Sequence, residues 1–84
     1  MAVDVTLRVL ANPTRRAMLG LVWDAERSSS EIAEAVGASR PATSQHLKVL
    51  RDAGLVCVRI DGSQRLYRAD TERLAEVRAA LEQF

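Results

Sequence analysis

The alternation of apolar and polar positions between residues 32 and 50 predicts two short helices separated by a tight turn. In the first helix Ile32, Ala33 and Val36 recur at helical spacing on one face. Gly37 follows the last apolar position, where a helix end often takes a left-handed backbone that glycine adopts without steric cost. Ser39 then stands where a side chain caps the next helix.

The second of these helices has an apolar side and a polar side. Thr43, Leu47 and Leu50 share the apolar side, and Pro41 stands in the first turn, where its missing N–H is not needed. The other side carries groups that pair with base edges and phosphates, namely Arg40, Ser44, Gln45 and Lys48. This layout is typical of a helix-turn-helix that reads DNA, although a polar face alone also occurs on a solvated helix of an ordinary bundle.

Residues 55–61 and 65–69 predict two strands joined by a tight turn. Val56, Val58 and Ile60 alternate along the first strand, and an Asp-Gly pair at 61–62 marks the turn. A hairpin directly after the polar helix is a wing. Three arginines flank its turn, Arg59, Arg65 and Arg68, and they suit phosphates or a narrow minor groove. Alternatively, they only keep an exposed strand edge from pairing with another chain.

The N-terminal third predicts two more helices. Asn12 is placed to cap the second of them, with Pro13 at its first position. That helix directs four apolar residues inward, Met18, Leu21, Val22 and Ala25. We expect a loop at residues 27–28, after which Ser28 and Glu31 have the spacing of a capping box.

A terminal helix begins after Asp70, and its apolar stripe either folds onto its own domain or pairs with a second copy. A recognition helix reads only a few base pairs, so a dimer on a two-fold site is the usual route to adequate specificity. We therefore favour the dimer, with the first helix beside the last. The expected interface comprises Val3, Leu7, Leu10, Leu74, Val77, Leu81 and Phe84.

Length and charge fit one small domain spanning residues 1–84. The net charge is +1, which does not indicate a uniformly basic, non-specific binder. Residues 39–68 nevertheless carry a formal charge of +4, and residues 70–84 carry −2. This uneven distribution of charge suggests that the basic surface binds DNA and that the chain assembles through a different surface.

Several other classes of function find no support in these residues. There is no apolar run of membrane-spanning length and no signal-peptide pattern, so we expect a cytoplasmic protein. A nucleophile with an acid–base partner is missing, so we expect no enzyme and no cofactor. We interpret the single cysteine, Cys57, as a small packed apolar residue, and we expect the single histidine, His46, to make a structural hydrogen bond to the backbone.

The chain resembles the ArsR/SmtB-type winged helix-turn-helix repressors in residues 10–16, 39–50 and 53–56, and in the Asp61-Gly62 turn ahead of residues 66–68. The resemblance covers nearly the whole chain. It implies a mainly α fold with a small β-hairpin wing: four helices, the hairpin and a fifth helix. It also implies a homodimer, formed by the first and last helices, that binds double-stranded DNA at a near-palindromic operator and represses transcription. Many members release DNA when an effector binds.

The chain departs from the metal-sensing members of that family. Those that sense through the third helix carry a cysteine pair near its start, whereas residues 27–32 have none. Those that sense zinc through the last helix need histidine there, and residues 70–84 offer only carboxylates. We therefore expect the metal-independent branch, with no metal site and with an unidentified small-molecule effector left open.

The expected DNA contacts fall into three groups. Arg40, Pro41, Ser44, Gln45 and Lys48 enter the major groove, while the wing arginines hold the backbone or the minor groove. Thr14 and Arg15 add phosphate contacts at the start of the second helix. The alternative is a winged-helix module that binds proteins without specific DNA binding, in which these polar residues would be dispensable.

Overall fold

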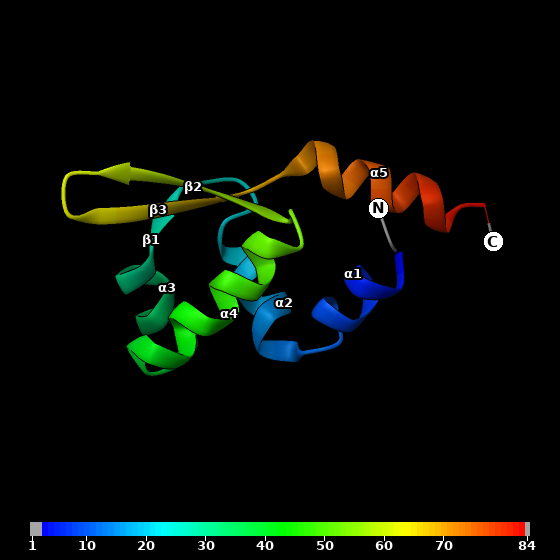
Figure 1. Cartoon of the computed structure of the whole chain (residues 1–84). Helices are drawn as coiled ribbons and strands as arrows, with labels where there is room; N and C mark the ends of the chain where they lie inside the picture. The colour runs from blue at the N-terminus through cyan, green and yellow to red at the C-terminus, as the bar shows by residue number, and fades with distance from the viewer. Residues whose placement is uncertain (1–2, 84) are drawn as a thin grey trace.

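A helix-turn-helix forms the centre of the computed structural model, which describes residues 3–83. It joins α3 (Ser29–Val36) to α4 (Arg40–Asp52) (Figure 1). Gly37 ends α3 with φ of +68°, in the left-handed region that favours glycine. Ser39 caps α4, because its Oγ accepts a hydrogen bond from the Ala42 N–H at 3.2 Å. The predicted turn chemistry is therefore confirmed.

Two further helices precede this unit, α1 (Val3–Leu10) and α2 (Pro13–Leu21). Asn12 caps α2 as predicted, since its Oδ1 accepts from the N–H groups of Thr14 at 2.9 Å and Arg15 at 3.1 Å. Because α2 ends at Leu21, its helical periodicity does not reach Ala25. The expectation that Ala25 points inward is wrong: that residue is exposed.

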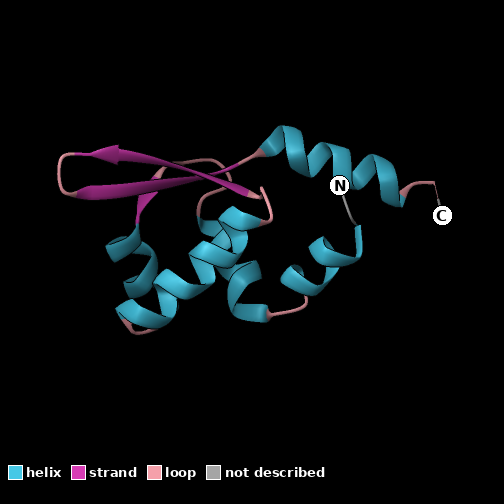
Figure 2. Cartoon of the chain, viewed as in Figure 1, coloured by secondary structure: helices cyan, strands magenta, loops and turns pink. Residues whose placement is uncertain are grey.

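The wing is a sheet of three antiparallel strands, one more than the sequence predicts. β2 (Val56–Asp61) and β3 (Gln64–Ala69) form the expected hairpin. β1 (Arg27–Ser28) pairs with the outer edge of β3 and gives the order β1-β3-β2 (Figure 2). The expected loop at residues 27–28 is therefore wrong. Ser28 still completes the predicted capping box with Glu31, through contacts of 2.9 and 3.1 Å.

The last helix, α5 (Thr71–Leu81), begins at its predicted cap, Asp70, and lies beside α1 at the end of the molecule opposite the wing tip (Figure 1). Val77 is buried inside the chain, whereas Leu81 is 39% exposed. On α1, Thr6 and Val9 face inward, and Leu7 is 50% exposed. Phe84 lies outside the described residues.

The core fills the space between the helices and the sheet. Leu19 of α2, which was not among the residues expected to point inward, is buried. The fully buried side chains include Met18, Val22, Ile32, Leu47, Leu50 and Leu55. Burying each of these side chains stabilises the folded state by about 1.5–3 kcal/mol. Nowhere in residues 3–83 is there a helix with the length and apolar character that crossing a membrane requires.

Two backbone hydrogen bonds attach the base of the wing to the helices. The N–H of Ala69 donates to the carbonyl of Val22 at 2.9 Å, and the N–H of Asp70 donates to the carbonyl of Leu55 at 2.9 Å. They join the end of β3 to the segments that follow α2 and α4. The wing is thereby held at a fixed place beside α4.

Candidate nucleic-acid interface

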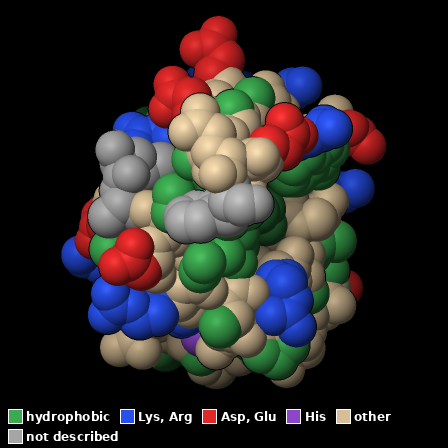
Figure 3. Space-filling model, turned by 90° about the vertical axis from the view of Figure 1, so that its right-hand side faces the viewer, with side chains coloured by type: hydrophobic (Ala, Val, Ile, Leu, Met, Phe, Trp, Pro, Cys, Tyr) green, Lys and Arg blue, Asp and Glu red, His purple; other side chains and the backbone are tan. Residues whose placement is uncertain are grey.

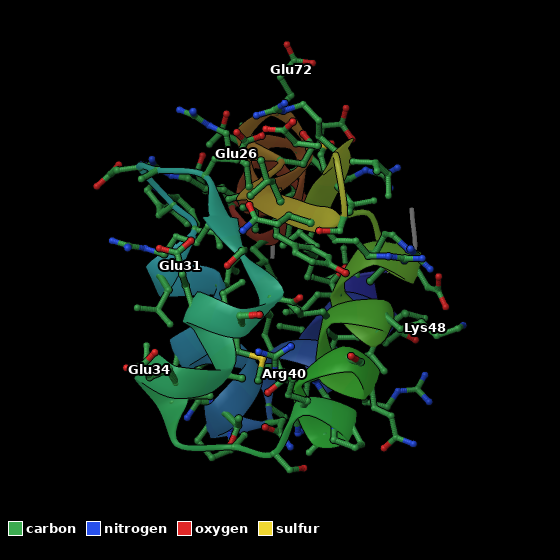
Figure 4. The ribbon with its side chains drawn as sticks, turned by 90° about the vertical axis from the view of Figure 1, so that its left-hand side faces the viewer. Glu26, Glu31, Glu34, Arg40, Lys48 and Glu72 are labelled. Atoms are coloured by element: carbon green, nitrogen blue, oxygen red, sulfur yellow. The ribbon has the colours of Figure 1, made fainter. Side chains whose placement is uncertain are left out.

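The outer side of α4 is exposed and polar, as predicted. Thr43, Leu47 and Leu50 are buried on its inner side. The exposed residues are the five predicted for the major groove, Arg40, Pro41, Ser44, Gln45 and Lys48. Figure 4 labels two of them, Arg40 and Lys48, which project from α4. The structure therefore brings this predicted set together on one accessible helix.

Lys48 has an acidic neighbour one turn along α4. Its Nζ lies 2.8 Å from Oδ2 of Asp52, and both side chains are more than half exposed. The hydrogen bond from Lys48 lowers the pKa of the Asp52 carboxyl, and the charges of Lys48 and Arg51 act in the same direction. An exposed pair of this kind is weak, so Lys48 is free to exchange its carboxylate partner for a phosphate.

The three wing arginines lie on two different faces of the sheet. Arg65 is two residues from the buried Tyr67, so it projects from the same face, toward the helices. Arg68 is next to Tyr67 and projects from the opposite face. Arg59 pairs across from Leu66 and shares the face of Arg68. All three were expected to act together on DNA, but the structure separates Arg65 from the other two.

Arg59 is held by an acidic residue of the loop before β1. Its Nε lies 3.0 Å from Glu26 Oε2, and its Nη2 lies 2.6 Å from Oε1. Hydrogen bonds from Arg59 lower the pKa of Glu26, and the charge of Arg68 adds to the effect. The same pair raises the pKa of Arg59. A phosphate contact by Arg59 stays a prediction, and it would require breaking this two-point pair.

Two adjoining hollows of about 310 and 370 Å³ lie between α4, the start of α3 and the wing. Ser29 and Arg65 line both hollows. Arg40 lines the larger, together with neighbouring residues of the first turn of α3 and of the wing turn. The smaller one, which we call the serine–arginine trough, is lined by Ser29, Ser44, Lys48, Arg51, Arg65 and Tyr67.

Sequence reasoning missed three members of the trough: Ser29, Arg51 and Tyr67. Arg51 was detectable, because it lies seven residues after Ser44 and so falls on the same stripe of α4. Ser29 was not detectable, because only the pairing of β1 with β3 brings the start of α3 next to the wing.

The side chains of Arg15 and His46 contact each other. Arg15 donates from Nε to the carbonyl of Val9 at 2.7 Å, and its Nη1 lies 3.4 Å from His46 Nδ1. The expected backbone partner of His46 is therefore wrong, since the contact is with a side chain. Arg15 fastens the end of α1 to α2, and phosphate contacts by Arg15 and Thr14 stay predictions.

At the opposite end an apolar groove of about 550 Å³ runs along α5. Trp23, which sequence reasoning did not single out, forms one wall and is 44% exposed. Leu74, Ala75 and Leu81 form the other wall. Figure 3 faces this end of the molecule and shows apolar side chains gathered between charges of both signs.

Cys57 is exposed on β2, so the expectation that it is packed is wrong. Its Sγ lies 3.8 Å from Asp70 Oδ2. Partial desolvation, followed by the nearby Asp70 carboxylate, raises the pKa of the thiol. Within residues 3–83 no three side chains of His, Cys, Asp or Glu are grouped so that they hold a metal ion.

The family model of the bacterial regulatory proteins of the arsR family matches residues 12–58. The HTH-type transcriptional regulator Rv2034 of Mycobacterium tuberculosis is 42% identical over 96% of this chain and 76% of its own length. A probable mercury resistance operon repressor of Streptomyces lividans is 40% identical over 83% of this chain. The chain spans only 56% of the length of that repressor.

Solved structures agree with these similarities in sequence. A possible transcriptional regulator for arsenical resistance superposes with a TM-score of 0.84 at 46% identity, covering 93% of this chain and 81% of that one. The homodimeric winged helix-turn-helix domain Mb0332 of Mycobacterium bovis has a TM-score of 0.76 at 34% identity, over 94% of this chain and 76% of that one. The chain therefore belongs to the ArsR family of winged helix-turn-helix proteins, which are DNA-binding transcriptional regulators and not enzymes.

Proposed function

We propose that residues 1–84 act as one domain, a dimeric repressor that binds a near-palindromic operator and excludes RNA polymerase from the promoter. The observation that supports this most directly is the exposed polar row of α4 beside the cation-lined hollows under the wing. In this arrangement a helix in the major groove and a strand along the flanking backbone engage DNA from the same side.

The roles of the side chains follow from their positions. Gln45 and Ser44 read base edges from the middle of α4, and Gln45 suits adenine because it donates and accepts at once. Arg40 and Lys48 stand at either side of them and bind guanine or phosphate. Arg65, on the helix-facing side of β3, binds the backbone and contributes affinity without sequence preference. Arg59 and Arg68 reach only DNA that bends around the outer face of the wing.

A second copy of the chain is proposed to dock on the α1–α5 end. Exposed apolar side chains are concentrated there, with Leu7 on α1 and Trp23 and Leu81 at the groove. The M. bovis relative is described as homodimeric, which supports the same assembly here. Two recognition helices would then lie about 34–36 Å apart, one turn of DNA. Val77 contributes indirectly, because it is already buried in its own chain.

The proposed effector is not a transition metal. Such ions prefer thiolate and imidazole ligands, and this chain has one cysteine and one histidine, which lie on different elements. We expect the effector instead to be a small apolar molecule that competes with the second copy at the Trp23 groove. Adding zinc to the protein–DNA complex tests this part: release of DNA at micromolar zinc would contradict it.

Selection of bound sequences from a random pool of duplex DNA tests the whole proposal. We expect a recovered motif with two inverted half-sites spaced by about one helical turn. On the selected duplex, the logarithm of affinity should fall linearly with the logarithm of salt, by about 0.9 per neutralised phosphate. Weak binding at every salt concentration would instead favour the protein-interaction module.

A further inference from the structure

The serine–arginine trough lies where three elements meet: the start of α3, the outer stripe of α4 and strand β3. We propose that it binds one backbone phosphate of DNA, with Arg51 and Arg65 as the cationic ligands and Ser29 as a hydroxyl donor. The inference rests on the proposed DNA binding. It adds Arg51 and Ser29 to the contact surface and assigns them to the phosphodiester rather than to bases.

The charge balance of the trough favours an anion. Lys48 and Arg51 come from α4, and Arg65 comes from β3, while no carboxylate belongs to the lining. Asp52, the acidic residue nearest along α4, is bonded to Lys48. Among residues 3–83, no hydrogen bond or ion pair engages the side chains of Arg51 and Arg65. An anion between these two guanidinium groups would relieve their repulsion and accept bidentate hydrogen bonds.

Neighbouring acids face elsewhere. Glu31, the acidic residue in the first turn of α3, is used in the capping box with Ser28. Figure 4 shows Glu31 and Glu34 on the side of α3 that is turned away from α4. Asp61 lies on β2 at the wing turn, which borders the other hollow rather than the trough. The charge of Lys48 is offset by Asp52, so the positive potential inside the trough comes mainly from Arg51 and Arg65.

Hydroxyl groups complete the ligand set. Ser29 is the first residue of α3, and Ser44 stands across from it on α4. Their hydroxyls supply hydrogen bonds that complement the fork of an arginine. A phosphate held from both sides would link α4 to β3, so that the recognition helix enters the groove at one fixed height.

The test compares the salt dependence of binding for wild type and Arg51→Gln on one random-sequence duplex. We expect affinity at low salt to fall about tenfold. The log–log salt slope should become shallower by about 0.9 for each subunit, because one phosphate per subunit is no longer neutralised. Arg51→Lys should restore the slope. Ser29→Ala should weaken binding a few-fold and leave the slope unchanged, since the hydroxyl carries no charge.

Arg16→Gln is the matched control, because Arg16 is an exposed arginine on α2 that is assigned neither to DNA nor to the second copy. It should leave the slope unchanged. An Arg51→Gln protein that is folded and binds with the slope of wild type overturns the phosphate site while leaving the proposed function intact. A wild-type protein that binds no duplex at low salt overturns both.

A second arm separates the DNA phosphodiester from free phosphate. Inorganic phosphate at millimolar concentration is added to wild type, and amide shifts near Ser29 and Arg51 are followed by NMR. The proposal expects small, non-saturating shifts, because a site of this kind needs the rest of the duplex for affinity. Saturable binding of inorganic phosphate that survives excess duplex would assign the trough to a small anion and contradict the proposal.

Discussion

The two ends of the molecule present opposite kinds of surface. The α4–wing end is hollowed and polar, and Arg51 and Arg65 line its trough without an acidic partner in the described chain. The α1–α5 end carries an apolar groove walled by Trp23 and Leu81. One surface is suited to a polyanion and the other to a protein or an apolar molecule, so binding DNA and binding a second copy need not compete.

The cations themselves show a related division. Arg59 is paired at two points by Glu26, whereas Arg65 on the other face of the same sheet is not paired within residues 3–83. A paired cation must exchange a carboxylate for a phosphate, and the net gain is small. An unpaired cation breaks no existing ion pair when it binds a phosphate. The structure thus ranks Arg65 above Arg59 as a DNA ligand, which the spacing of arginines alone does not.

The largest expected effect comes from a core substitution that destabilises the whole domain and so affects both surfaces together. Leu50 is fully buried in α4, between the two ends. Leu50→Ala should lower the free energy of unfolding by about 2–5 kcal/mol, because it leaves a cavity in the core. Urea unfolding measures the loss. Val49→Ala on the same helix, at a position 37% exposed, is the control and should cost far less.

The next effect separates base reading from phosphate binding within the polar end. Gln45→Ala should cost about 1–3 kcal/mol at one position of the selected operator and little on other sequences. Arg65→Ala should weaken every sequence by a similar factor. Competition binding against operators with single base changes measures both. Uniform losses for both variants would remove the assigned division of roles.

A smaller effect tests the apolar end. Leu81→Ser should weaken self-association by about 1 kcal/mol, because Leu81 lies in the groove proposed for the second copy. Sedimentation equilibrium measures the change, and emission from the single tryptophan, Trp23, reports whether the groove becomes wetter. Ile60→Ser is the matched control: Ile60 is 63% exposed on the wing and should leave self-association unchanged.

The smallest effect concerns the Glu26–Arg59 pair. Arg59 holds the pKa of Glu26 below its ordinary value of 4.5. The stability that this carboxylate contributes is therefore present above pH 4.5 and is lost as the pH falls through the lowered pKa. Glu26→Gln should abolish that part of the acid dependence. Thermal unfolding followed between neutral and acidic pH checks it, with Glu34→Gln on α3 as the control, because Glu34 is exposed and has no hydrogen-bonded side-chain partner within residues 3–83.

Local chemistry made α3, the turn and α4 predictable. Asn12, Ser28, Ser39 and Asp70 cap their helices by contacts no more than three residues away, so the sequence alone contains the signal. The exposed polar row of α4 follows from the same periodicity. For these parts the sequence and the structure agree almost residue for residue.

Contacts distant in sequence were not predictable in the same way. β1 has two residues and exists only because β3 pairs with it, 38 or more positions along the chain. Glu26 and Arg59 are 33 residues apart. The face of the sheet on which each wing arginine lies could have been predicted, because a two-residue turn fixes the register and so places positions 59 and 65 on opposite faces. That step requires the register of the hairpin as well as its existence.

Only Asp70 separates β3 from α5, so the strand that carries Arg65 continues almost directly into the helix proposed to meet a second copy. The hydrogen bonds of Ala69 and Asp70 to the segments after α2 and α4 hold this junction to the rest of the domain, so each chain itself fixes the angle between its wing and its last helix. In the proposed dimer, the distance between the two wings would then be decided by how the two α5 helices meet.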